Sequence, residues 1–229
     1  MRNAAPNTPI VFSIVGNPVA DGLVASLARP GGNITGASTR ELELYPKRIQ
    51  LVRELLPRAT RVAILLDTPG PQGMSPELQR SLKALDDAGR QLGFTTESLT
   101  VASANEVGPA FDRLVRERFD AILVFTYFRL LGNSRQVVID HARRTRLPAI
   151  YPAEFWVDPG GLLSYSQNLT ELGHRAADYL DKILRGAHPA DLPVEEPNLF
   201  ELVINLKTAR ALGLAIPQSL LLRADRVIE

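Results

Sequence analysis

The chain has 229 residues, of which 45% are hydrophobic and 22% charged, and its formal net charge at pH 7 is +1. This length and composition predict a globular protein with a well-buried core, in one large domain or two small ones, and exclude a disordered chain. The near-neutral charge gives no electrostatic reason to expect nucleic acid or an anionic membrane as a partner. Because there is no cysteine, disulfides, cysteine-ligated metals and a cysteine nucleophile are excluded.

Apolar runs and helical patterns alternate along the chain, separated by Gly and Pro. The β-rich apolar runs predict strands at residues 10–15, 33–38, 61–66, 94–101, 121–125, 148–151, 162–165 and 200–205. Amphipathic or capped stretches predict helices at residues 19–27, 43–56, 75–92, 105–117, 134–145, 153–157, 169–184, 206–212 and 218–224. Strands separated by helices favour parallel pairing with right-handed crossovers, so we expect an α/β protein.

The predicted elements fall into two groups of different size. Residues 41–166 carry five strands with their helices, which suits one compact lobe. Residues 1–40 and 167–229 are each too small to fold alone. We therefore expect these flanking segments to pack together as a second lobe, with the chain crossing between the lobes twice.

No motif of enzyme chemistry stands in the sequence. The glycine-rich dinucleotide and phosphate loops are missing, and so is the nucleophile elbow of the hydrolases. The three histidines, His141, His174 and His188, have no metal-ligand spacing, and we expect them to be surface or packing residues. The sequence therefore predicts a protein without catalysis, cofactor or metal.

The residues that follow the strands are the candidates for ligand binding, because open α/β sheets bind ligands outside the carboxyl ends of their strands. These candidates are short polar groups and aromatic rings, namely Gly16, Asn17, Asp67, Thr68, Thr126, Tyr127, Tyr151, Glu154, Ser164 and Tyr165. Such a set suits a small polar or aromatic molecule. The alternative is that Asn, Gly and Asp are ordinary turn residues here. The tyrosines are harder to explain that way, since three of the five in the chain follow or end different strands.

Two stretches carry a family resemblance. Residues 22–36, GLVASLARPGGNITG, and residues 200–209, FELVINLKTA, together are specific rather than generic α/β pattern. The chain resembles, over essentially its whole length, a family of bacterial ABC-transporter substrate-binding proteins, in a branch linked to tryptophan or tyrosine uptake. The resemblance implies a type I periplasmic-binding-protein fold, with two Rossmann-like lobes whose parallel sheets are flanked by helices.

The resemblance also implies a function. It predicts the solute-binding component of an ABC importer, which holds a small polar or aromatic molecule, for example an amino acid, in the cleft between its lobes. Its further partner would be the ABC permease, and its location the periplasm. The sequence departs from the family at Asn17, where an aspartate is usual, at Asp67-Thr68 and at Thr126-Tyr127. The identity of the ligand is therefore not carried over from any relative.

The start of the chain is a further departure. Family members carry a signal peptide and roughly half a lobe before the strand at 10–15, whereas this sequence begins just ahead of it. We therefore expect a first lobe incomplete at its N-terminus, as in a fragment or a truncated gene model, and a cytoplasmic location if the chain is expressed as given. Two other functions stay open: a ligand-sensing regulatory domain of the same fold, and a Rossmann-like enzyme using Asp67 or Glu154.

Overall fold

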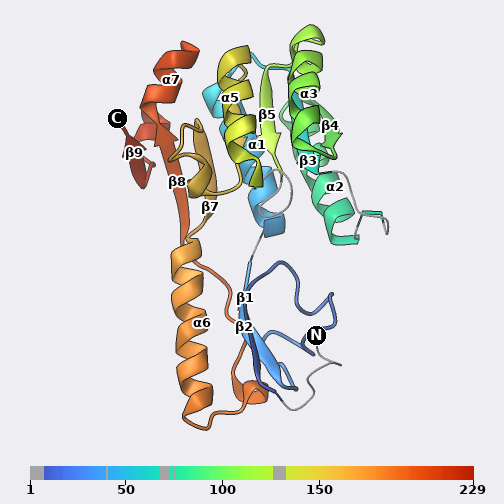
Figure 1. The fold of residues 1–229 in the computed structure, drawn as a ribbon, viewed down its shortest axis with the longest axis vertical. Coiled ribbons are helices and arrows are strands. Elements are labelled where there is room, and N and C mark those ends of the chain that lie inside the picture. Colours follow the sequence, from blue (N-terminus) through green and yellow to red (C-terminus); the bar gives the residue numbers. More distant parts are fainter. Residues whose placement is uncertain (1–7, 40, 68–72, 75, 126–132) are drawn as a thin grey trace. The chain divides into compact units, whose positions relative to one another are not determined.

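A computed structural model of the protein describes residues 8–39, 41–67, 73–74, 76–125 and 133–229. The chain divides into two compact units. Unit 1 comprises Met1–Leu42 and Gln167–Phe200, and unit 2 comprises Glu43–Ser166 and Glu201–Glu229. Strands and helices alternate along both (Figure 1), which confirms the predicted α/β class.

Unit 2 is built on a seven-stranded sheet in the order β4-β3-β5-β6-β7-β8-β9. Its strands are β3 (Arg61–Asp67), β4 (Thr95–Val101), β5 (Ala121–Val124), β6 (Ala149–Tyr151), β7 (Leu163–Gln167), β8 (Phe200–Asn205) and β9 (Arg226–Ile228). The ladders from β4 to β7 are parallel, as predicted, and so is the β8–β9 ladder. The backbone N–H of Asn205 donates to the Leu162 carbonyl at 2.9 Å. The end of β8 therefore lies beside the start of β7, and the two strands run antiparallel.

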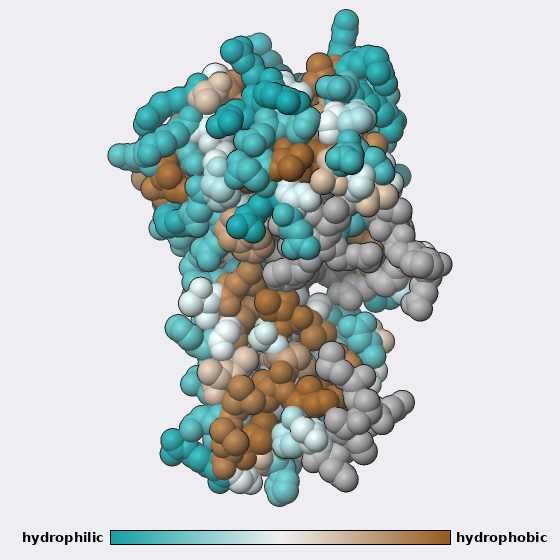
Figure 2. All heavy atoms as spheres, viewed as in Figure 1, coloured by the Kyte–Doolittle hydropathy of each residue, from teal (hydrophilic) through white to brown (hydrophobic). Residues whose placement is uncertain are grey.

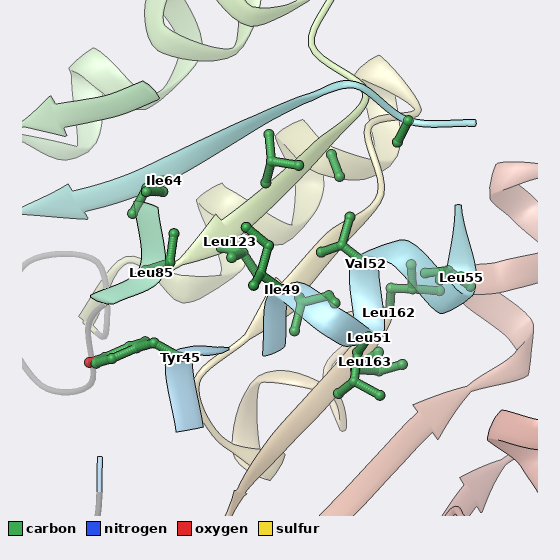
Figure 3. Packing of buried hydrophobic residues seen from close by; sticks show 14 of the residues in the cluster. Tyr45, Ile49, Leu51, Val52, Leu55, Ile64, Leu85, Leu123, Leu162 and Leu163 are labelled. Carbon is green, nitrogen blue, oxygen red and sulfur yellow. The ribbon is translucent and has the colours of Figure 1, made fainter. Parts of the chain in front are cut away.

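Helices pack their apolar faces against this sheet. They are α1 (Glu41–Leu55), α2 (Pro76–Gln91), α3 (Ala104–Arg116), α5 (Arg135–Thr145), α7 (Leu206–Leu212) and α8 (Gln218–Leu221), with a 3₁₀ turn η1 (Glu154–Trp156) after β6. Figure 3 shows Ile49 of α1 beside Leu123 of β5, and Leu85 of α2 beside Ile64 of β3. Full burial of each such side chain stabilises the fold by about 1.5–3 kcal/mol.

Unit 1 has a smaller framework. The parallel strands β1 (Ile10–Val15) and β2 (Ile34–Ser38) pair with each other, followed much later by the long helix α6 (Leu169–Leu184) and the 3₁₀ turn η2 (Pro189–Asp191). Glu195 adds a bridge to β2, since its N–H donates to Gly36 at 3.0 Å and its carbonyl accepts from Ser38 at 2.8 Å. Arg175 and Tyr179 of α6 bind the Glu195 carboxylate, at 2.5 and 3.1 Å, and thereby fix the helix to this segment.

The surface of unit 1 is more apolar than that of unit 2 on the face drawn in Figure 2, where hydrophobic residues gather over unit 1. Among its described residues, the large apolar side chains that are at least 40% exposed are Ile14, Val19, Leu180, Leu184 and Leu199. A two-stranded sheet with one long helix offers little interior in which to bury such groups. None of the described helices of either unit is both long enough and apolar enough to cross a membrane.

The helix predicted at residues 19–27 is wrong. Residues 18–23 form turns instead, in which the Asn17 side-chain oxygen accepts from the Ala20 N–H at 3.0 Å and the Leu23 N–H donates to the Pro18 carbonyl at 2.9 Å. Gly22 has φ +67°, a left-handed conformation that interrupts a helix. The local turn chemistry of Asn, Pro and Gly therefore overrides the weak helical pattern.

The domain prediction also needs correction at its C-terminal end. Residues 201–229, expected to lie with residues 1–40, belong to unit 2 because β8 and β9 complete its seven-stranded sheet. The chain consequently passes between the units three times rather than twice, at residues 42–43, 166–167 and 200–201. The helix expected at 218–224 ends at Leu221, and the short strand β9 follows.

Candidate functional site

The carboxyl ends of the parallel strands of unit 2 share one edge of the sheet. Asp67 ends β3 and is half-buried, and Tyr151 ends β6. Ser164 is the register partner of Tyr151, so it lies at the same level. The strand β7 continues to Gln167, two residues beyond its predicted end, so Tyr165 lies within β7 rather than after it. The predicted binding residues Asp67, Tyr151, Ser164 and Tyr165 thus come from three strands that end toward one edge.

Arg48 of α1 holds two backbone segments at this edge. Its side chain is 1% exposed. Nε donates to the Tyr165 carbonyl at 2.8 Å, and Nη2 donates to the Pro152 carbonyl at 3.0 Å. A planar guanidinium presents several donors in a fixed fork, which lets one side chain bridge two carbonyls. The loop after β6 is thereby tied to β7.

An aromatic pair stands beside this guanidinium. The Tyr45 and Phe125 rings stack with centroids 4.0 Å apart and an interplanar angle of 10°. Arg48 lies over the Tyr45 ring, with its central carbon 5.3 Å from the centroid. In Figure 3 the Tyr45 hydroxyl points away from Ile49 and Leu123, toward the margin of the core. Phe125 directly follows β5, so the pair lies toward the same edge of the sheet, with both rings buried in the core.

Tyr151 and Glu154 face other parts of unit 2. Tyr151 is 1% exposed, and its ring stacks on Trp156 with centroids 5.3 Å apart, which gives it a packing role in this structure. Glu154 lies 4.0 Å from Arg226 of β9. Burial and the nearby Glu201 and Asp158 carboxylates raise the pKa of Glu154, while Arg226 opposes the shift. Its carboxylate is therefore engaged with β9.

Tyr165 is the predicted residue whose setting best suits polar recognition. It is half-buried against the core of unit 2. Burial, with a smaller effect of Asp225, raises the pKa of the Tyr165 hydroxyl, and Arg223 and Arg48 act in the opposite direction. The hydroxyl therefore stays protonated at neutral pH and can donate a hydrogen bond.

The remaining predicted residues are in unit 1 or outside the described part of the chain. Gly16 and Asn17 follow β1, and the Asn17 side-chain oxygen accepts from the Ala20 N–H within its own turn. Thr68, Thr126 and Tyr127 lie outside the described residues. Among the described residues, no group of three or more His, Cys, Asp and Glu side chains is placed to hold a metal ion.

Residues of the helix α1 were missed because the prediction considered only the segments after strands. Tyr45, Ile49, Val52 and Leu55 form the buried face of α1. Arg48 belongs to the same face, three residues after Tyr45, and is equally buried. A charge at a core-facing position of an amphipathic helix is a signal for a structural or functional role, and it was available in the sequence.

Three comparisons place the chain among known proteins. A family model described as ABC transporter substrate binding protein matches residues 1–228. A tyrosine-binding protein of Clostridioides difficile (strain R20291) is 28% identical over 212 residues, 93% of this chain and 59% of that protein. The chain thus spans less than two thirds of the length of this curated relative.

Two solved structures resemble the fold closely. The ABC domain in complex with L-Trp from Streptococcus pneumoniae has a TM-score of 0.83 at 27% identity, covering 99% of this chain and 74% of that one. A conserved domain protein from Vibrio cholerae has a TM-score of 0.81 at 26% identity, with 98% and 73% covered. With the whole-chain family match, these likenesses confirm the type I periplasmic-binding-protein fold. The chain belongs to the ABC transporter substrate-binding protein family.

Proposed function

We propose that this protein is the solute-binding component of an ABC importer and that its solute is a small amphipathic molecule, with aromatic L-amino acids as the leading candidates. The observation that carries the proposal is the family match over residues 1–228. The names of two relatives add the solute class, since one is a tyrosine-binding protein and the other was solved with L-Trp. No catalytic step is part of this proposal.

The geometry of unit 2 supports a site for such a solute. The half-buried Tyr165 ring and the buried Tyr45–Phe125 stack belong to one core cluster at this sheet edge, and ligand pockets are typically lined by aromatic rings with a few placed polar groups. The backbone carbonyls of Tyr165 and Pro152 are held by Arg48, so the edge is preorganised. Preorganisation lowers the entropy lost on binding.

The partner and the location follow from the same proposal. A solute-binding component delivers its ligand to a permease, so we propose the ABC permease of the cognate transporter as the protein partner and the periplasm, or the outer face of the membrane, as the place of action. A pull-down of the membrane fraction with the tagged chain, with and without solute, tests this part. Solute-dependent capture of an ABC permease is expected.

Thermal-shift measurement with the L-amino acids and related small carboxylates tests solute binding. A ligand that binds only the folded state raises Tm, and at 100 times Kd the added stability is about 2.7 kcal/mol. We expect a rise with L-tyrosine or L-tryptophan that is reduced in Tyr165→Ala. A flat response across the whole panel would speak against the proposal. The exposed Arg80 on α2 gives a control, Arg80→Ala, which is expected to respond like the wild type.

A further inference from the structure

A cavity of about 380 Å³ lies within unit 2, away from the candidate solute site. It is found where α1 ends and where the neighbouring strands β3 and β5 begin. Leu55 lies at the end of α1 away from Tyr45 (Figure 3), so this cavity is at the amino ends of the strands, opposite the edge that carries the solute site. Its lining residues are Leu55, Leu56, Pro57, Arg58, Ala59 and Asp120.

The turn that forms one wall of this cavity is fixed by Arg53 of α1. Its Nη1 donates to the Pro57 carbonyl at 2.8 Å and to the Ala59 carbonyl at 3.0 Å. Its Nη2 donates to the Leu92 carbonyl at 2.5 Å, and the guanidinium lies over the Phe94 ring, 4.0 Å from the centroid. The wall is therefore formed before any ligand arrives, which lowers the entropy lost on binding.

The opposite wall carries a carboxylate with one oxygen to spare. Oδ2 of the half-buried Asp120 accepts from the backbone N–H groups of Thr60 at 2.7 Å and Arg61 at 2.9 Å, and from the Thr60 hydroxyl at 3.3 Å. The described residues give Oδ1 no hydrogen bond. These contacts hold the carboxylate in one orientation and leave Oδ1 able to accept a further hydrogen bond.

A cation completes the lining. The Arg58 side chain is exposed, and in the part of the chain that the structure describes no carboxylate, that of Asp120 included, lies within ion-pair distance of it. The remaining lining residues are apolar: Leu55, Leu56, Pro57 and Ala59. The cavity thus combines an apolar floor with one negative and one positive group that do not neutralise each other directly.

We propose that this cavity is a second binding site, which takes a free α-amino acid with an aliphatic side chain. The ammonium of the ligand donates to Asp120 Oδ1, its carboxylate pairs with Arg58, and its side chain packs on the apolar floor. The volume is near the lower end of the range for small-molecule sites, about 300–1,000 Å³, which suits a ligand of this size. The site shares no residue with the candidate solute site, so the inference does not rest on the proposed function.

Titration of the isotope-labelled chain with L-leucine, followed by the NMR shifts of the backbone amides, tests this inference. Saturable shifts are expected at Leu56, Arg58, Ala59, Thr60 and Asp120. Arg58→Glu replaces an attraction by a repulsion at an exposed position, so we expect an affinity about 10-fold weaker with an unchanged Tm. Arg58→Lys should bind nearly as well as the wild type. Arg80→Glu, at an exposed arginine of α2, is the matched control and should bind like the wild type.

Two further probes test the need for both charges. Isoamylamine keeps the ammonium and isocaproate keeps the carboxylate of a leucine-like ligand. We expect each of them to bind about 10-fold more weakly than L-leucine, because one hydrogen-bonded charge is missing. Equal affinity of either probe would overturn the assignment of the ligand class.

The outcomes separate this inference from the proposed function. Absence of shifts at these amides, or equal affinity of Arg58→Glu and the wild type, would overturn it. Shifts confined to the other edge of the sheet, as at Ser164 and Tyr165, would place leucine in the solute site and overturn the second site alone. Failure of L-tyrosine and every other amino acid to shift those two amides would count against the proposed function and leave the second site standing.

Discussion

The guanidinium of Arg48 donates to the main-chain oxygen of Tyr165 at 2.8 Å, so a buried cation on α1 fixes the backbone of β7. The same side chain reaches the Pro152 carbonyl at 3.0 Å. One residue thus ties together a helix, a strand and the loop after β6.

Replacing Arg48 by leucine should destabilise unit 2 by about 2–4 kcal/mol, because two buried carbonyl oxygens lose a charged donor. Arg48→Lys should recover only part of this loss, since an ammonium cannot reproduce the fork. Urea unfolding followed by the fluorescence of Trp156, the single tryptophan of the chain, measures the effect. Arg80→Leu serves as the exposed control. A midpoint for Arg48→Leu equal to that of the control would contradict the bridging role.

Gly36→Ala should disrupt unit 1. Gly36 has φ +148°, and a Cβ built there would lie 1.9 Å from the Phe12 carbonyl oxygen across the β1–β2 ladder. Because that neighbour is backbone, the strands must separate, and we expect a loss of more than about 3 kcal/mol. Hydrogen exchange of the β1 and β2 amides is the measurement.

Gly32→Ala is the matched control for this change, because its Cβ would meet nothing within 4 Å. Its exchange rates should stay close to those of the wild type. Equal protection of β1 and β2 in the two variants would show that the close approach at Gly36 is not required.

The pH dependence of stability should change in Glu154→Gln. The pKa of Glu154 is raised above its ordinary 4.5, chiefly by burial. The folded state therefore binds more protons than the unfolded state between the ordinary and the raised pKa, and stability falls as pH rises through that window. Glutamine removes this dependence. The free energy of unfolding of the variant should therefore rise relative to that of the wild type between pH 4 and pH 7, by less than about 1 kcal/mol. Urea midpoints across this range measure the gain, and a constant difference would refute the assignment.

Tyr179→Phe should weaken the attachment of α6 to the Glu195 segment. The Tyr179 hydroxyl contacts the Pro193 carbonyl and lies 3.1 Å from a Glu195 carboxylate oxygen. Its removal should cost about 1–2 kcal/mol. Thermal unfolding measures this, and Tyr165→Phe, at a half-buried tyrosine of unit 2, shows whether the loss is specific to α6. No change in Tm for Tyr179→Phe would show that the Tyr179 hydroxyl is not needed and that Arg175 holds α6 to the Glu195 segment.

Much of the fold could be predicted from the sequence because the strands are continuous apolar runs. Residues 61–67 and 121–124 are such runs, and both are buried strands of the seven-stranded sheet. Order along the chain cannot say which sheet a late strand joins, so residues 201–229, which carry most of β8 and all of β9, were assigned to the wrong unit. The turns after Asn17 were missed because they depend on hydrogen bonds to the Asn17 side chain and the Pro18 carbonyl. The spacing of apolar residues, from which the helix was predicted, carries no information about such bonds.

The candidate site was less predictable. A rule that selects residues after strands finds Asp67 and Tyr151, yet it cannot tell that the Tyr151 ring packs on Trp156. The same rule does not select Arg48, because Arg48 lies on a helix and donates to the Tyr165 carbonyl from there. The direction of a side chain and its hydrogen-bond balance appear only in three dimensions.

Isothermal titration of the wild-type chain with L-tyrosine and with L-tryptophan tests the central claim most directly. We predict saturable binding of at least one of them, with one molecule bound per chain and an affinity reduced in Tyr165→Ala. Absence of binding by either amino acid, and by the other L-amino acids under the same conditions, would contradict the assignment of this protein as an amino-acid-binding component of an importer.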